Sequence, residues 1–161
     1  MVNKVYQIDE TTITWRASGG TNLFTPTSLA AGAGRQGAYH DLGTTARAIH
    51  YKWRAFIKPG ATRVVGEVVR VYLVTSDGTN PDNDDGTGDI AVSAEDKLKN
   101  LDQIGSIIID EDAAVTMVGH GFVLLPHRYV APVFWNATAN ALSSTAADFG
   151  FDLTPVPPEI Q

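Results

Sequence analysis

Residues 47–58, "RAIHYKWRAFIK", alternate between side chains of two kinds. One set is apolar and would face a core: Ile49, Tyr51, Trp53, Ala55 and Ile57. The other set consists of Ala48 and the polar residues His50, Lys52 and Arg54. Successive side chains of a β-strand point to opposite faces, so a period of two residues is typical of a strand. The segment therefore predicts a half-buried strand with one solvated face.

The same alternation recurs elsewhere in the chain. Strands with one apolar face are expected in "TITWRA" (12–17), with Ile13 and Trp15 inward, and in "FGFDLT" (149–154), with Phe149, Phe151 and Leu153 inward. Residues 68–74, "VVRVYLV", are apolar on nearly both faces, which indicates a central strand. Further strands are expected within residues 105–110, 114–125 and 128–136. Pro132 cannot donate a ladder hydrogen bond, so we expect an edge strand or a bulge there.

Turn-forming stretches separate these strands, and the helical signal is weak. Only residues 93–101, "SAEDKLKNL", are typical of a helix, with Ser93 as the expected N-cap and Asp96 three residues later. The pattern predicts an all-β fold, an antiparallel two-sheet β-sandwich of the jelly-roll type, with at most one short helix. We expect a single domain over residues 1–161, with an N-terminal strand or arm (1–25) and a proline-rich tail (154–161). The tail is expected to remain an unpaired polyproline II arm.

Composition excludes several classes of site. The chain of 161 residues has no cysteine, which rules out disulfides, thiolate nucleophiles and cysteine-based zinc sites. The net charge is −6, and residues 77–112 hold 11 of the 18 acidic residues against two lysines. Nucleic acid is not an expected partner, because its phosphates require clustered Lys and Arg. Neither a membrane-spanning stretch nor a secretory signal is visible, so we expect no membrane partner.

Residues 32–37, "GAGRQG", match the dinucleotide-binding pattern G-x-G-x-x-G through Gly32, Gly34 and Gly37. That site requires a buried strand before the glycines and a helix after them, whose N-terminus receives the pyrophosphate. Here a proline-containing stretch precedes the glycines and an alternating strand follows. We therefore predict no cofactor, and instead a connecting loop that leads into the strand at 49–57. Arg35 and Gln36 are expected to anchor this loop by hydrogen bonds.

Residues 77–89, "DGTNPDNDDGTGD", form an acidic loop that invites a calcium hypothesis. Calcium takes six to eight oxygen ligands, and five carboxylates could contribute: Asp77, Asp82, Asp84, Asp85 and Asp89. The spacing does not fit an EF-hand, because Asp85 occupies the required glycine position and no glutamate closes the loop. We favour a solvated hairpin tip and assign no metal site.

Histidines and tryptophans are the remaining candidates. The four histidines, at positions 40, 50, 120 and 127, lack zinc-site spacing, and the chain has no G-x-S-x-G motif. A triad assembled in space stays open, but we assign no catalytic residue and do not expect an enzyme. The three tryptophans could stack on sugars or fill the core. We favour the core for Trp15, Trp53 and Trp135, with Trp135 the least constrained by the alternation.

Three longer stretches carry turn and strand signatures in the same order along the chain. They are "SLAAGAGRQGAYHDLG" (28–43), "VRVYLVTSDGT" (69–79) with "KNLDQIGSIII" (99–109), and "LPHRYVAPVFWNATANALSSTAADFGFDLTPVPPEI" (125–160). Together they resemble small jelly-roll proteins of tailed-phage structural modules, in particular capsid decoration (cement) proteins. The resemblance covers residues 23–160. It departs at Gly37, where many relatives have a serine after "GRQ".

The resemblance implies a non-enzymatic virion protein on the outside of the capsid, commonly a dimer or trimer. Such a protein bridges neighbouring major capsid proteins and is made in the bacterial host cytoplasm, which suits a chain without cysteine. We expect capsid contacts from residues 1–30, from the "PPEIQ" tail and from exposed loops, with no single residue assigned. The alternative is a carbohydrate- or receptor-binding β-sandwich of a head fibre or tail, whose partner would be a glycan.

Overall fold

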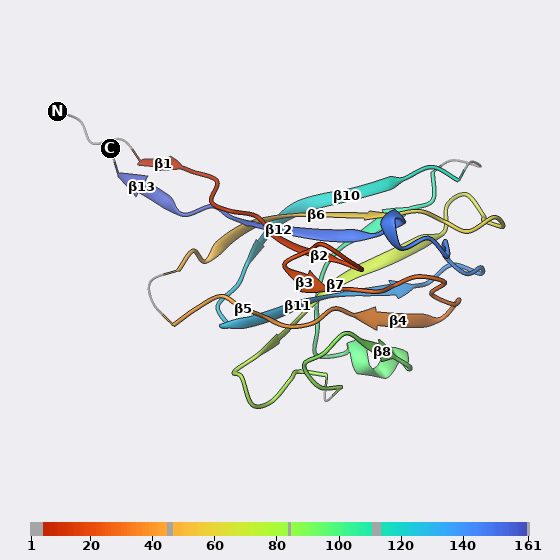
Figure 1. The fold of residues 1–161 in the computed structure, drawn as a ribbon, viewed down its shortest axis with the longest axis horizontal. Helices are drawn as coiled ribbons and strands as arrows, with labels where there is room; N and C mark the ends of the chain where they lie inside the picture. The colour runs from red at the N-terminus through yellow and green to blue at the C-terminus, as the bar shows by residue number, and fades with distance from the viewer. Residues whose placement is uncertain (1–4, 45–46, 84, 111–113, 161) are drawn as a thin grey trace.

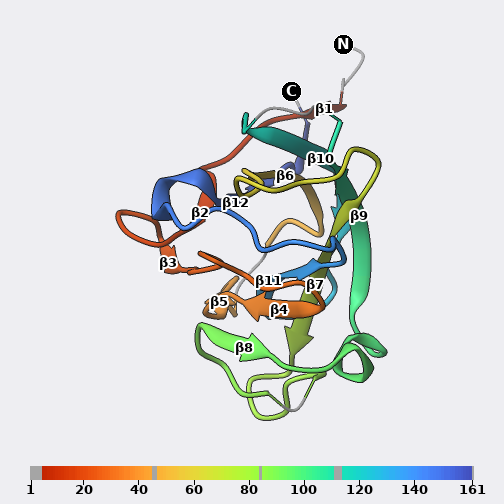
Figure 2. The same ribbon diagram turned by 90° about the vertical axis from the view of Figure 1, so that its right-hand side faces the viewer.

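Two β-sheets pack face to face in the computed structural model, which describes residues 5–44, 47–83, 85–110 and 114–160 (Figure 1, Figure 2). The first sheet contains, in spatial order, β10 (Met117–Leu124), β6 (His50–Ile57), β12 (Gly150–Pro155), β2 (Ile13–Arg16) and β3 (Asn22–Leu23). The second contains β8 (Ile90–Val92), β4 (Ala33–Gln36), β11 (Tyr129–Asn136), β7 (Val68–Ser76) and β9 (Asp102–Ile108). The short β5 (His40–Asp41) pairs with the first residues of β11. Neighbouring strands are antiparallel except for β2 and β3.

The strand order is that of a jelly roll. In chain order the eight principal strands are β2, β4, β6, β7, β9, β10, β11 and β12. The first sheet takes the first, eighth, third and sixth of these, and the second sheet takes the second, seventh, fourth and fifth. Two interleaved Greek keys produce this order. The predicted all-β sandwich of jelly-roll type is therefore confirmed.

The main core lies between the sheets, and the alternation predicted its members. Trp53, Phe151 and Leu153 are all buried there, as are the inward residues of β7. Ile49 is the exception, because it precedes β6 and is exposed. A smaller apolar cluster covers the other face of the second sheet, where Tyr72 and Val74 of β7 meet Leu98. Strand β7 is thus buried on both faces, as its continuous apolar run predicts.

Trp53 fills space that glycines leave open. A Cβ atom at Gly105 of β9 would lie 2.8 Å from the Cη2 and Cζ2 atoms of the indole. A Cβ atom at Gly121 of β10 would lie 2.9 Å from its Nε1 atom. Because real Cβ atoms essentially never approach other atoms so closely, both positions require glycine if the indole is to stay where it is.

The termini form a two-stranded ribbon, so the prediction of an unpaired C-terminal tail is wrong. Strand β1 (Val5–Gln7) pairs antiparallel with β13 (Pro158–Ile160). The prolines permit this because their carbonyl groups still accept hydrogen bonds: Pro157 accepts from Ile8 at 3.3 Å, and Pro155 accepts from Glu10 at 3.0 Å. Figure 1 shows the ribbon extending beyond the two sheets at the end where both termini lie.

Pro132 lies in an interior strand, so the edge position is wrong. The other expectation, a bulge, fits the registers, in which residues 37–39 lie opposite the two residues 131 and 132. Strand β11 is flanked by β7 along its whole length and by β5 and β4 on the other side. The Pro132 carbonyl accepts from Gly37, just beyond the end of β4. The proline nitrogen therefore faces the interval between β4 and β5, where no ladder hydrogen bond is lost.

Helical structure is confined to two 3-10 turns among the described residues, η1 (Glu95–Leu98) and η2 (Ala146–Asp148). The first falls within the predicted helical stretch. Its N-cap position is held by Ala94 without a side-chain hydrogen bond, so the assignment of Ser93 as the cap is wrong. The buried Leu98 fixes this turn over the second sheet.

Candidate functional site

The outer face of the first sheet carries two cross-strand rows of functional side chains. In one row His120 of β10 lies opposite Arg54 of β6, and Arg54 lies opposite Asp152 of β12. In the other row Phe122 lies opposite Lys52, which lies opposite Thr154. These positions face outward because the residues that alternate with them are in the core.

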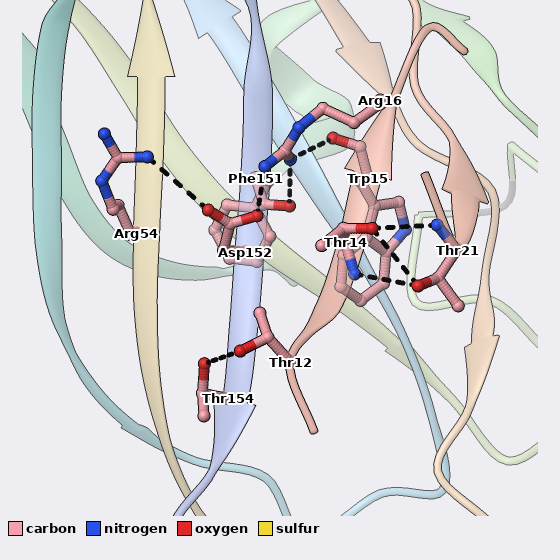
Figure 3. Close-up of polar contacts among 9 residues, drawn as sticks. All are labelled: Thr12, Thr14, Trp15, Arg16, Thr21, Arg54, Phe151, Asp152 and Thr154. Carbon is pink, nitrogen blue, oxygen red and sulfur yellow. Dashed lines mark hydrogen bonds and ion pairs between the residues drawn. The ribbon is translucent and has the colours of Figure 1, made fainter. Parts of the chain in front are cut away.

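Asp152 lies between two guanidinium groups (Figure 3). Its carboxylate accepts a hydrogen bond of 2.5 Å from Arg16 Nη2 and lies 3.6 Å from Arg54 Nη1. Arg16 Nη1 also donates to the backbone carbonyls of Trp15, at 2.8 Å, and Phe151, at 3.0 Å. These contacts hold Arg16 rigidly against the sheet.

Arg54 is held far less tightly. Its side chain is 52% exposed, and its contacts among the described residues are the approach to Asp152 and a stacking contact 5.3 Å above the Phe56 ring. Arg16 lies over the same ring at 4.9 Å. Two cations thus share one carboxylate, which leaves this part of the face with an excess positive charge. The N–H groups of Arg54 are available to a ligand with carboxylate or hydroxyl oxygens.

A groove of about 670 Å³ runs along these rows. Its lining residues are Thr12, Lys52, Trp53, Arg54, His120, Gly121, Phe122, Asp152 and Thr154. The Phe122 ring is 75% exposed at its margin. The hydroxyls of Thr12 and Thr154 bond each other at 2.8 Å (Figure 3), and in the described part of the chain no histidine or carboxylate bonds either of them. The groove has the chemistry of a binding surface, with an aromatic ring, cations and hydroxyl groups.

The glycine-rich stretch forms a strand rather than the predicted loop. Residues 33–36 are β4, which lies between β11 and β8, and no helix follows them. Gly34 is required by close packing, since a Cβ atom there would lie 2.9 Å from the Trp135 ring. Arg35 donates two hydrogen bonds to the Asp89 carboxylate, at 2.8 and 2.7 Å. The predicted hydrogen bonding of Arg35 is confirmed, but it joins strand β4 to Asp89 and does not anchor a glycine-rich loop.

Gln36 anchors the acidic loop from the same strand. Its buried amide donates to the carbonyls of Gly86, at 2.9 Å, and Gly88, at 3.2 Å, and accepts from Asn83 at 2.7 Å. The loop after β7 is therefore attached to β4 through a side chain with no exposed surface. The predicted hydrogen bonding of Gln36 is confirmed as well, although the loop that it anchors is the acidic one.

The carboxylates of the acidic loop bond separate protein partners. Asp77 accepts from backbone N–H groups of its own turn, Asp82 bonds Thr75, and Asp85 pairs with Lys97. Burial would raise the pKa of Asp89, but hydrogen bonds from Arg35 and Thr25 lower it overall. No cluster of three metal-ligating side chains occurs among the described residues, which do not include Asp84.

The structure also shows where the candidate histidines and tryptophans lie. His40 is close to Asn22 and to the Trp15 ring, and burial lowers its pKa despite the neighbouring Asp41. His120 lies in the groove. The three tryptophans are 0%, 4% and 5% exposed at positions 15, 53 and 135, so their predicted place in the core is confirmed.

Sequence reasoning did not identify the groove. Its signal was present in the outward positions of two predicted strands, where Arg54 and Asp152 alternate with core residues. The pairing of β6 with β12, which brings these residues together, is not visible in either segment. The sequence did not indicate an exposed Phe122, because β10 has glycines in place of apolar side chains on much of its inner face and the alternation is therefore weak there.

None of the helical segments in the described part of the chain has the length and apolarity needed to cross a bilayer. A comparison of the chain with protein-family models matches none of them, and a comparison with curated proteins finds no significant match.

Proposed function

We propose that this protein is a virion structural protein that binds the outside of a tailed-phage capsid and stabilises the lattice. Its partners are the major capsid protein and further copies of itself. It is made in the host cytoplasm and acts on the capsid surface, without catalysis. The resemblance of residues 23–160 to decoration proteins supports this proposal, and so does the jelly-roll sandwich, a rigid scaffold for surface contacts.

The observation that carries the proposal is the terminal ribbon. Strands β1 and β13 pair only with each other among the described strands, so each has one free edge. Val5 is 66% exposed and Tyr6 is 45% exposed, which leaves both without support from the core. An isolated two-stranded ribbon is marginally stable. Strand addition to a partner would satisfy the free backbone groups and cover these side chains.

A repetitive lattice amplifies weak contacts of this kind. Each ribbon has three residues per strand, so one contact supplies few hydrogen bonds. When several copies of an oligomer engage neighbouring capsid subunits, the later contacts become intramolecular and overall binding strengthens by orders of magnitude. A short projecting ribbon is therefore sufficient for stable decoration.

Co-sedimentation with undecorated capsids of the cognate phage tests this function. A variant with Val5→Ser and Tyr6→Ser removes the exposed apolar surface of the ribbon. The matched control, Val64→Ser with Val65→Ser, removes comparable exposed surface, at 49% and 54%, from the connection between β6 and β7. We expect wild type and control to pellet with capsids, and the ribbon variant to bind at least about tenfold more weakly. Absence of wild-type binding would refute the function, and equal binding of the two variants would refute the role of the ribbon.

A carbohydrate-binding function is the second candidate, and the groove on the first sheet favours it. The exposed Phe122 ring could stack against the apolar face of a sugar, while Arg54 and Thr154 offer polar partners. Wild type and the variants Phe122→Ala and Arg54→Ala should be compared on a glycan array. Signals that both variants lose would support this candidate, and a wild type without signals would remove it.

A further inference from the structure

Strand β10 is an open sheet edge without the usual protection. It pairs with β6 along all eight residues, and no described strand pairs with its other side. Figure 1 draws it at the margin of the sandwich. Edge strands are normally protected by charges, prolines or short length. Residues 117–124 contain no Asp, Glu, Lys, Arg or Pro, and Val118, Phe122 and Leu124 are 44%, 75% and 59% exposed.

The backbone groups on this free edge can be identified. The N–H of Leu125 donates to the carbonyl of Ile49 at 2.9 Å, so the odd-numbered residues beside it direct their N–H and C=O groups toward β6. In an antiparallel strand these directions alternate. The even-numbered residues therefore present their N–H and C=O groups to the free edge: Val118, His120, Phe122 and Leu124.

We propose that β10 is a homodimer interface, in which a second copy of the chain adds its own β10 antiparallel to the first. The two-fold axis passes midway between Gly121 of one copy and Gly121 of the other. In this register Val118 lies opposite Leu124 of the second copy, and His120 lies opposite Phe122 of the second copy. Each of the four residues whose backbone groups face the free edge then donates one hydrogen bond to the second copy and accepts one from it. The two first sheets become one continuous sheet.

The register is the one that satisfies every free backbone group of β10. A shift by one residue places the N–H groups on the free edge of one β10 opposite residues of the other β10 whose backbone groups already bond β6. A shift by two residues leaves groups unpaired at both ends of the strand. The axis falls at Gly121, whose missing side chain is also what admits Trp53 below it.

The occupant is a second copy because the strand is complementary to itself. Two-fold pairing places apolar side chains next to each other, Val118 with Leu124 of the second copy, and cross-strand pairs of this type are stabilising. Identical strands that carried Lys or Glu would repel each other, and β10 carries neither. This inference concerns the protein in solution and does not rest on the proposed capsid function.

Cysteine cross-linking tests the register, and the natural chain has no cysteine to interfere. Single variants Val118→Cys and Leu124→Cys are oxidised separately and as a mixture. In the proposed register the two positions lie opposite each other, with Cα atoms about 5.5 Å apart, which is within disulfide range. Residue 118 of one copy lies six residues along the strand pair from residue 118 of the other, a separation of about 20 Å, and the same holds for residue 124. We expect covalent dimers in the mixture and none in either variant alone.

Light scattering tests the interface without cysteines. We expect wild type to be a dimer and Phe122→Lys to be a monomer, because the substitution places a charge on the paired edge. Phe122 is mostly exposed, so the circular dichroism spectrum of the variant should match that of wild type. Leu23→Lys on β3, at the opposite edge of the same sheet, is the matched control and should remain a dimer.

Three results would overturn the inference: a monomeric wild type, a dimer that survives Phe122→Lys, or a mixture of the cysteine variants without cross-links. A mixture of Leu23→Cys with Leu124→Cys should stay uncross-linked and controls for random collision. Loss of capsid binding by the ribbon variant would leave these results unchanged. A monomeric wild type that still pellets with capsids would overturn the β10 dimer alone, and a dimer that does not pellet would overturn the capsid function alone.

Discussion

Substitution of Gly105 by alanine should destabilise the protein by overfilling the space around Trp53. The added Cβ atom would lie 2.8 Å from two indole atoms, well inside van der Waals contact. Overpacking in a core costs about 1–3 kcal/mol. Replacing glycine in extended backbone gains about 0.4–1 kcal/mol through the unfolded chain. The net expectation is a loss of about 1–2 kcal/mol.

The assay is denaturant unfolding of Gly105→Ala in the wild-type and Trp53→Phe backgrounds. A phenylalanine ring lacks the Cη2 and Cζ2 atoms that meet the new methyl group. In that background Gly105→Ala should keep only the gain of about 0.4–1 kcal/mol, so the coupling between the two substitutions is the overpacking cost of about 1–3 kcal/mol. For a domain of this size the single variant should melt about 2–8 °C lower than wild type.

Gly88→Ala is the matched control. Its Cβ atom would meet Ile90 at 3.8 Å, an ordinary contact, and its backbone does not have a positive φ. We expect no loss of stability there. Equal destabilisation by Gly105→Ala in both backgrounds, or none in either, would show that Trp53 is not confined as the packing indicates.

The remaining predictions concern polar anchors. Asp89→Asn should cost about 2–3 kcal/mol near neutral pH because Arg35 loses a two-point carboxylate partner. Folding lowers the pKa of Asp89. The stability lost by Asp89→Asn is therefore complete above the unfolded-state pKa of about 4, and it disappears as the pH falls through the folded-state pKa. Denaturant midpoints of both proteins across the acid range check this. Gln36→Leu should leave buried carbonyls of the acidic loop without donors, cost about 2–3 kcal/mol and speed limited proteolysis within residues 77–89. Asp152→Asn should leave two neighbouring guanidinium groups without their shared anion and lower the melting temperature, by an amount that shrinks as salt is added.

Predictions from sequence succeeded where the signal is local. The alternation at 50–57 and 149–154 identified strands and their buried faces, because successive side chains of a strand point to opposite faces. The continuous apolar run at 68–74 identified β7 as central for the same reason. Arg35 and Gln36 make the hydrogen bonds expected of them, but to the acidic loop and not within the glycine-rich stretch.

Predictions failed where a feature depends on which strand lies next to another. The edge position, one of two expectations for Pro132, was wrong, because the interval between β4 and β5 accommodates a residue without an N–H group inside the sheet. The glycine-rich stretch was assigned to a loop because the context of a dinucleotide site is absent and glycines permit tight backbone paths. Pairing with β11 on one side and β8 on the other makes it a strand.

The sequence by itself determined the class of the fold, the faces of its strands and the residues of its core. The tertiary structure alone decided that the two termini pair as a ribbon, that Arg16 and Arg54 meet at Asp152, and that β10 is left as a bare edge. The physical reason is the range of the interactions. Hydrophobic periodicity extends over a few neighbouring residues, whereas strand pairing can join segments more than a hundred residues apart, as it joins β2 to β12.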